Sequence, residues 1–362
     1  MRNLIYKRFL RNLLLGLVLL FIIYMILFSM QFGPYLPTEY WIRDVYILKH
    51  HIATDIKEKK IVIIAGSSGL FGIDSSLLEE ITGIKTVNMS THAGLTLDFL
   101  LEPRKLFLKQ GDIAVLPLEF ECYHQKTLYN DLTIEAVITW DKKYYDHLSL
   151  WKKLEFISSC SPLRVAAALF QKYVSQQKRY NLSPARIISA AEASWAKENN
   201  MLKSGPLYQN IDRYGDIIQN KGTTNKVKAV GYGGMGSPDW EVTSYSKKAI
   251  SSFVNYCREN DIRVFFTWPS TLKSQRFNLN NKIIQDNLTK IKDFFNQLAV
   301  PVLGEPGDFN FERKYFFDTH YHLNQVGRDI RTRRLMNHLP HGMKKRKKVR
   351  KNVPGKKSRK VH

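Results

Sequence analysis

Two short polar segments, one near each end of the chain, carry side chains that could perform acyl transfer. The first is Gly66-Ser67-Ser68, and the second runs from Asp318 to His322. A serine hydroxyl is a weak nucleophile until a base removes its proton, and a histidine oriented by a carboxylate is such a base near neutral pH. Ser68, His322 and Asp318 are therefore the candidate nucleophile, base and orienting acid.

Only the fold can bring these distant segments together, so the elements around them matter. Residues 61–65, IVIIA, are apolar and mostly β-branched, which predicts a buried parallel strand directly before the first segment. Four more strands are predicted at 85–88, 112–117, 262–267 and 300–303, with helical patterns between them. This alternation predicts a three-layer α/β/α sandwich with a five-stranded, mainly parallel sheet (flavodoxin-like). Both polar segments should lie at the carboxyl ends of its strands, where ligands bind.

The two segments resemble the first and last sequence blocks of the SGNH/GDSL hydrolase superfamily. In that family a strand leads into a Gly-Asp-Ser or Gly-Ser-Ser block that carries the nucleophile. The chain closes with an Asp-x-x-His block, which usually runs on as His-x-Asn-x-x-Gly. Here residues 63–68, IIAGSS, match the first block, and residues 322–327, HLNQVG, match the last. The resemblance implies Ser68 as the nucleophile and His322 as the base.

Departures from the family pattern leave alternatives open. Asp318 lies four residues before His322 rather than three, and Asp318-Thr319-His320 could instead form an Asp-x-His pair with His320 as the base. Such a pair resembles that of the alginate acetylation proteins. His322 is preferred because the Leu-Asn-x-x-Gly continuation follows it. Ser67 stays the alternative nucleophile.

Hydrogen-bond donors for a developing oxyanion are incompletely specified. The resemblance implies Gly94 as the glycine of the second block, although a loop glycine without that role fits as well. The Asn of the third block is missing, because the chain reads LPLEFE at residues 116–121, and Asn88 is the candidate to replace it. We predict no metal and no other cofactor, since the isolated histidines have no ligand spacing with acids or cysteines; these are His92, His124 and His147.

An apolar run without charge occupies residues 13–32 and reads LLLGLVLLFIIYMILFSMQF. A helix of this length rises about 30 Å, enough to cross the hydrocarbon of a membrane, and no small-residue cleavage site follows. Basic residues precede the run and mixed charges follow it, so the positive-inside rule predicts that residues 1–12 are cytoplasmic. We therefore expect an uncleaved signal anchor in the plasma (inner) membrane, with the rest of the chain outside the cytoplasm.

The remaining regions flank or interrupt the α/β domain. A linker is expected at 33–60, and the family resemblance covers 61–120 and 245–338. Residues 121–244 are rich in Tyr, Lys and helical patterns, which predicts a largely helical insertion that covers or shapes the site. Residues 341–362 hold about half of the net charge of +23 and predict a disordered basic tail. Its alternative role is attraction to anionic lipid or an acidic glycan; nucleic acid is not expected outside the cytoplasm.

Within the family, the chain looks closest to membrane-tethered members that modify cell-surface polymers. These include the alginate O-acetylation proteins and the teichoic-acid D-alanylation protein. The resemblance implies an O-acyltransferase that acts on an extracytoplasmic glycan or anionic polymer, to which a membrane-bound partner could supply the acyl group. Two alternatives stay open. One is an esterase or deacetylase with the same residues, and the other is a non-catalytic subunit that binds polymer or a partner.

Overall fold

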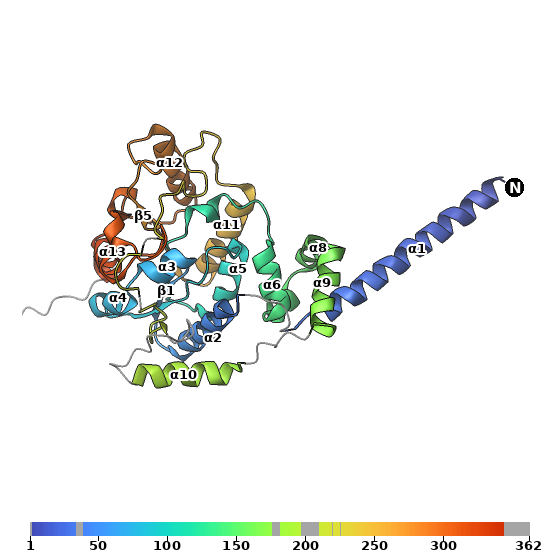
Figure 1. Ribbon diagram of the computed structural model, residues 1–362. Coiled ribbons are helices and arrows are strands. Elements are labelled where there is room, and N and C mark those ends of the chain that lie inside the picture. The colour runs from blue at the N-terminus through green and yellow to red at the C-terminus, as the bar shows by residue number, and fades with distance from the viewer. Residues whose placement is uncertain are drawn as a thin grey trace, which may run out of the picture.

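The computed structural model describes residues 2–33, 39–175, 182–196, 210–218, 220–224 and 226–343. Its first helix, α1 (Arg2–Met30), projects away from the rest of the molecule (Figure 1). The segment Leu4–Met30 is long and apolar enough to cross a membrane, by length and composition. Residues 344–362 of the predicted basic tail lie outside the described residues.

One sheet of five parallel strands forms the centre of the molecule, which confirms the predicted α/β class. The strand order is β2-β1-β3-β4-β6, and every neighbouring pair is parallel. Its central strands are buried on both faces, as their apolar sequences predict. The three-layer, flavodoxin-like description stays a prediction. The strands are β1 (Lys60–Ile63), β2 (Lys85–Asn88), β3 (Ile113–Leu116), β4 (Arg263–Thr267) and β6 (Val302–Leu303).

The strand order indicates where on the sheet a ligand would bind. The chain passes from β1 to β2 on one side and then to β3 on the other, so the strand order reverses between β1 and β3. This is where open parallel sheets bind ligands. A separate parallel pair, β5 (Thr271–Leu272) with β7 (Asn310–Phe311), lies outside the main sheet.

Helices connect the strands and carry the polar segments. Helix α3 begins directly in the first segment, and α13 follows the last (Figure 1). The connecting helices of the α/β part are α3 (Ser67–Gly72), α4 (Ser75–Thr82), α5 (Leu97–Leu101), α11 (Ser244–Glu259), α12 (Lys282–Gln297) and α13 (Gln325–Asn337). The 3₁₀ helices are η1 (Glu102–Phe107), η2 (Phe120–Tyr123), η4 (Pro306–Phe309), η5 (Arg313–Tyr315) and η6 (His341–Met343).

The segment expected to be a linker, residues 33–60, contains a packed helix instead. Helix α2 (Tyr40–Asp55) buries Ile42, Val45, Leu48 and Ile52 in the core. Their spacing of three to four residues places them on one helix face. The domain therefore begins before β1.

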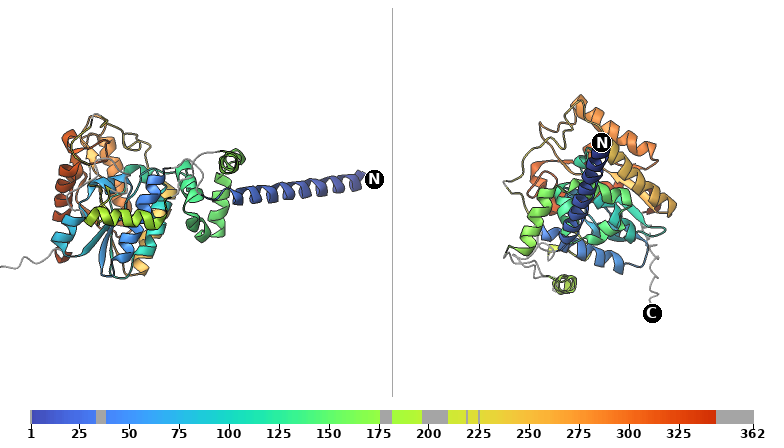
Figure 2. Two further views of the ribbon diagram at one scale, coloured as in Figure 1. Left: turned by 60° about the horizontal axis from the view of Figure 1, so that its bottom comes forward. Right: turned by 90° about the vertical axis from the view of Figure 1, so that its right-hand side faces the viewer.

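The region between the two halves of the α/β domain is largely helical. Its helices are α6 (Asp131–Thr139), α7 (Lys142–His147), α8 (Leu150–Ser159), α9 (Pro162–Tyr173) and α10 (Pro184–Ala196). The left view of Figure 2 shows that α8 and α9, in green, lie at the end of α1 nearest the rest of the molecule, where α9 contacts α1. Helix α10 instead packs against α2. Residues 176–181 and 197–209 of the predicted insertion lie outside the described residues.

A buried ion pair ties the start of β1 to the residue before β3. Lys60 Nζ lies 2.8 Å from Asp112 Oδ2, and the Lys60 N–H donates to Asp112 Oδ1 at 2.9 Å. Both side chains are almost fully buried. Each charge is therefore compensated only by the other and by nearby backbone groups, and the loss of one leaves the other without its partner.

We expect Asp112→Ala to lower the free energy of unfolding by about 3–5 kcal/mol, because it leaves the Lys60 charge buried and unpaired. Denaturant titration of the full chain in detergent measures this. The control is Asp286→Ala, which removes a half-exposed carboxylate from an ion pair with Lys282 and should leave stability nearly unchanged. Small, equal losses in both variants would contradict the assigned role of the buried pair.

Candidate functional site

The turn after β1 packs against two other loops at the carboxyl edge of the sheet. A Cβ atom on Gly66 would lie 2.5 Å from Ala93 Cα and 2.7 Å from Glu119 Oε1. Only glycine fits such a close approach. The loop after β2 and the residues after β3 are therefore pressed directly against the first polar segment.

Glu119 holds this turn in place from the end of β3. Its Oε1 atom accepts the Ser68 N–H at 2.6 Å, and its Oε2 atom accepts the Gly66 N–H at 3.0 Å. Burial raises the pKa of Glu119 to about 7, although the two N–H groups pull it down. Glu119 lies in the segment 116–121, where the family's third block would carry its Asn. A single acidic residue after a strand does not indicate from sequence that it binds a neighbouring turn.

The two serines of the turn face different surroundings. The Ser68 side chain is 0% exposed, and its Oγ atom lies 3.5 Å from Ser270 Oγ. Ser67 keeps 8% exposure, and no residue in the described part of the chain forms a hydrogen bond with its hydroxyl. Both serines are buried, and Ser67 is the less buried of the two.

Helix geometry explains this difference. Residues four apart on a helix share a face, so Ser67 lies on the face of Phe71, and Ser68 on that of Gly72. A Cβ atom on Gly72 would lie 2.0 Å from Arg331 Nη1, and Arg331 also donates to the carbonyl of Ser68 at 2.8 Å. The face of Ser68 is therefore covered by α13.

The last polar segment forms an Asp–His pair. His322 Nδ1 lies 2.8 Å from Asp318 Oδ1. Burial raises the pKa of Asp318, but the hydrogen bond and charge of His322 outweigh this effect and hold it below its ordinary value. Asp318 is therefore ionised at neutral pH, which favours a proton on Nδ1 and leaves Nε2 as the free base.

The imidazole of His322 also reaches helix α3, which begins at Ser67. It stacks on the ring of Phe71, with the ring centroids 3.9 Å apart and the planes 7° from parallel. The structure thus brings His322, Asp318 and helix α3 together. Among the described residues, however, neither Ser67 nor Ser68 is hydrogen-bonded to His322, so the full triad stays a prediction.

The alternative base, His320, is placed differently. Its ring packs against Tyr232 and Tyr321, with centroids 5.1 and 4.6 Å away. Burial, and then the charge of His322, lower the pKa of His320 to about 4. Since the hydrogen bond of Asp318 goes to His322, the geometry favours His322 as the base.

Both donors predicted for an oxyanion are engaged in other bonds. The Gly94 N–H donates to His92 Nδ1 at 3.0 Å. The Asn88 amide donates to the Gly69 carbonyl at 2.9 Å and to Asp216 Oδ1 at 2.8 Å. An oxyanion role for either residue stays a prediction, and it requires these bonds to exchange.

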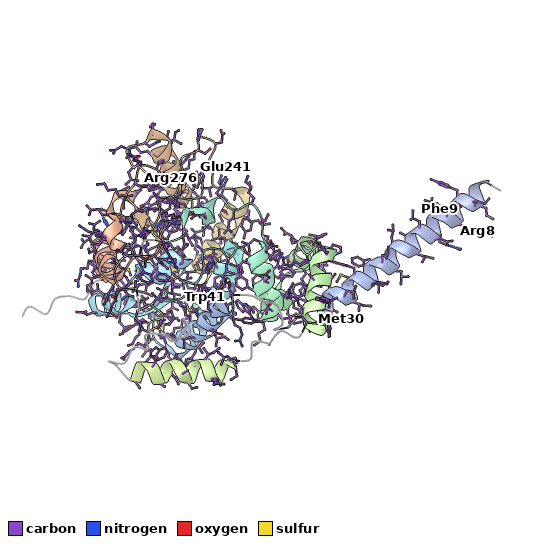
Figure 3. All side chains as sticks on the ribbon, in the orientation of Figure 1. Arg8, Phe9, Met30, Trp41, Glu241 and Arg276 are labelled. Atoms are coloured by element: carbon purple, nitrogen blue, oxygen red, sulfur yellow. The ribbon has the colours of Figure 1, made fainter. Side chains whose placement is uncertain are left out.

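His92 is a further neighbour that the sequence did not assign to the site. Its ring contacts Trp41 of α2, with centroids 5.5 Å apart, and Figure 3 shows Trp41 on the body of the molecule. Burial lowers the pKa of His92, and the charge of His322 adds to this effect. His92 therefore lies near enough to His322 for a charge on His322 to disfavour protonation of His92.

No group of three or more His, Cys, Asp and Glu residues that could hold a metal ion occurs in the part of the chain described. Comparison with protein-family models and with curated proteins finds no match for this chain. The resemblance to the SGNH/GDSL hydrolases therefore stays a prediction, and the geometry of the site carries the functional proposal.

The raised pKa of Glu119 predicts a pH-dependent stability that Glu119→Gln removes. Between about pH 4.5 and about pH 7 the folded chain keeps a proton that the unfolded chain has released, so rising pH lowers stability. The unfolding free energy of the wild type, relative to that of Glu119→Gln, should fall by up to about 3 kcal/mol across this range. Denaturation at several pH values measures it, and a constant difference would contradict the raised pKa.

Proposed function

We propose that this protein is a membrane-anchored, serine-dependent O-acyltransferase that modifies a cell-surface glycan or anionic polymer with an acetyl or similar group. The observation that carries the proposal is the Asp318–His322 pair, whose imidazole stacks on the helix that bears the two serines. A histidine oriented by an ionised carboxylate beside an accessible hydroxyl is the arrangement that activates serine for acyl transfer.

Ser67 is the nucleophile that the geometry supports best. Ser67 is less buried than Ser68 and shares the helix face of Phe71, on which His322 stacks. Ser68, which the family motif favours, is fully buried against Ser270. A serine that must meet a donor and then an acceptor has to be reachable by both, and this requirement favours Ser67.

The proposed reaction uses these residues in two half-reactions. The Ser67 oxygen bonds to the carbonyl carbon of the donor while His322 Nε2 takes the hydroxyl proton and then returns it to the departing group. A hydroxyl of the polymer next attacks the acyl-serine, loses its proton to His322 and carries the acyl group away, after which Ser67 regains the proton. Asp318 keeps the imidazole oriented and stabilises its charged form.

Membrane anchoring supports transfer over hydrolysis. Helix α1 has the length and composition of a membrane span, and the charges around it favour a cytoplasmic N-terminus and an extracytoplasmic domain. An anchored enzyme stays where lipid-linked donors and growing polymers emerge, a location that a free esterase does not need. A membrane-bound protein that delivers the acyl group fits the same arrangement.

The ester content of the surface polymer tests the reaction. In cells that lack the protein, we expect reintroduced Ser67→Ala to leave acylation as low as in the deletion, because the nucleophile is gone, and Ser68→Ala to restore most of it. Immunoblots verify equal protein levels. Raised acylation in the deletion would indicate an esterase. Loss of acylation with Ser68→Ala but not with Ser67→Ala would identify Ser68 as the nucleophile. Full restoration of acylation by both variants would indicate that the protein is a non-catalytic binding subunit.

The roles of the two histidines can be separated in the purified full chain. We expect Asp318→Asn to lower kcat for hydrolysis of p-nitrophenyl acetate by about 10²–10⁴-fold, because the imidazole loses its orientation and its charge partner. His320→Gln is the matched control and should retain most of the activity, since the Asp318 bond goes to His322. The opposite pattern would assign the base to His320.

A further inference from the structure

Large exposed apolar side chains are concentrated in one helical pair outside α1. We call residues 150–174, which comprise α8 and α9, the α8–α9 hairpin. It exposes Leu150, Trp151 and Leu154 on α8, Leu163, Phe170 and Tyr173 on α9, and Val174 directly after α9. Elsewhere beyond α1, only Leu106 and Val326 are large apolar residues exposed to this degree within the described residues. Such a concentration marks an interaction surface.

The exposed apolar residues of α9 form one continuous stripe. Besides the three large ones of the helix, Ala166 and Ala167 are exposed, so the stripe follows helical spacing from residue 163 to residue 174. Val165 and Ala168 are buried on the opposite face. A helix on the surface of a soluble domain normally turns one apolar stripe inward and leaves the other side polar. Helix α9 is apolar on both sides.

The α8–α9 hairpin packs against the C-terminal end of α1. Tyr24 Oη donates to the Cys160 carbonyl between the two helices, and the buried ring of Phe28 packs 6.3 Å from that of Phe156. Lys172 Nζ donates to the carbonyls of Met30 and Phe32. Figure 3 shows Met30 at this junction, far from Arg8 at the other end of α1.

The length of α1 sets the depth of this junction. The helix rises about 20 Å from Arg11, its last charged residue, to Tyr24, where the α8–α9 hairpin makes its first contact. Starting from Arg8 gives about 24 Å. Both values are shorter than the hydrocarbon core, which is about 30 Å thick. If the charged end of α1 lies at one membrane surface, the opposite surface lies beyond Tyr24, at the level of the α8–α9 hairpin.

We propose that the α8–α9 hairpin is a membrane-docking element whose exposed apolar face is buried in the outer leaflet around α1. The proposal rests on α1 being a membrane span. Lys152 and Arg164 of the hairpin are already paired with acidic residues of the protein, so the apolar face rather than charge carries the proposal. Trp151 and Tyr173 are of the residue types that gather at membrane interfaces. Docking would fix the orientation of the α/β domain relative to the membrane surface.

Site-specific fluorescence in lipid vesicles tests the proposal with the full chain. Since Cys122, Cys160 and Cys257 are all buried, an introduced exposed cysteine can be labelled selectively with an environment-sensitive dye. The test position is Leu163→Cys, and the matched control is Leu106→Cys in η1. The two leucines have nearly equal exposure, 80% and 83%. Leu20→Cys in α1 reports on the span itself.

Vesicles of phosphatidylcholine and phosphatidylglycerol with spin-labelled acyl chains provide the quencher. We expect dye at residues 163 and 20 to shift to the blue and to be quenched several-fold more than dye at residue 106. Phe170→Cys provides a second reading if Leu163→Cys does not fold. If dye at residue 20 is quenched but dye at residue 163 is quenched no more than dye at residue 106, the docking proposal is wrong, although α1 still spans the membrane. Absence of quenching at residue 20 would overturn both.

Discussion

The stacking of the His322 imidazole on the Phe71 ring joins the two ends of the α/β domain, and the proposed chemistry depends on it. Phe71 belongs to the short helix after β1, whereas His322 precedes the last long helix. Asp318 fixes the ring from its other side through Nδ1. Arg331 reinforces the same junction, since its guanidinium donates to the carbonyls of Ser68 and Trp268. The far end of the chain therefore contributes part of what positions the helix that bears the two serines.

The turn itself is held by buried polar groups, which are costly to desolvate. Glu119 binds two N–H groups of the turn, and burial raises its pKa. Asn88 and Asp216 support α3 and α4 from beneath, because Asn88 binds the Gly69 carbonyl and Asp216 binds Ser75. A purely apolar arrangement would avoid this desolvation. The polar one fixes the direction in which each serine points, which is the property that a nucleophile requires.

The sequence predicted the sheet well because buried parallel strands are short apolar runs with little ambiguity. It also predicted that Asp318 and His322 would meet, since both follow the last strand. It favoured Ser68 as the nucleophile and kept Ser67 as the alternative. It could not place the two hydroxyls, because successive helical residues point about 100° apart and the register of α3 depends on Arg331 and Glu119, which lie far away in sequence. Helix α2 was missed because its apolar stripe is interrupted by Asp44 and Lys49, which are buried too. The outward stripe of α9 was likewise indistinguishable from an ordinary core-facing one.

Covalent labelling tests whether an activated serine lies beside His322. A fluorophosphonate reacts with an activated serine hydroxyl and releases fluoride, and mass spectrometry of the digested full-length protein identifies the modified residue. We expect modification of Ser67, with strong loss of labelling in Ser67→Ala and in His322→Ala. Labelling confined to Ser68, or labelling that persists unchanged in His322→Ala, would contradict this expectation.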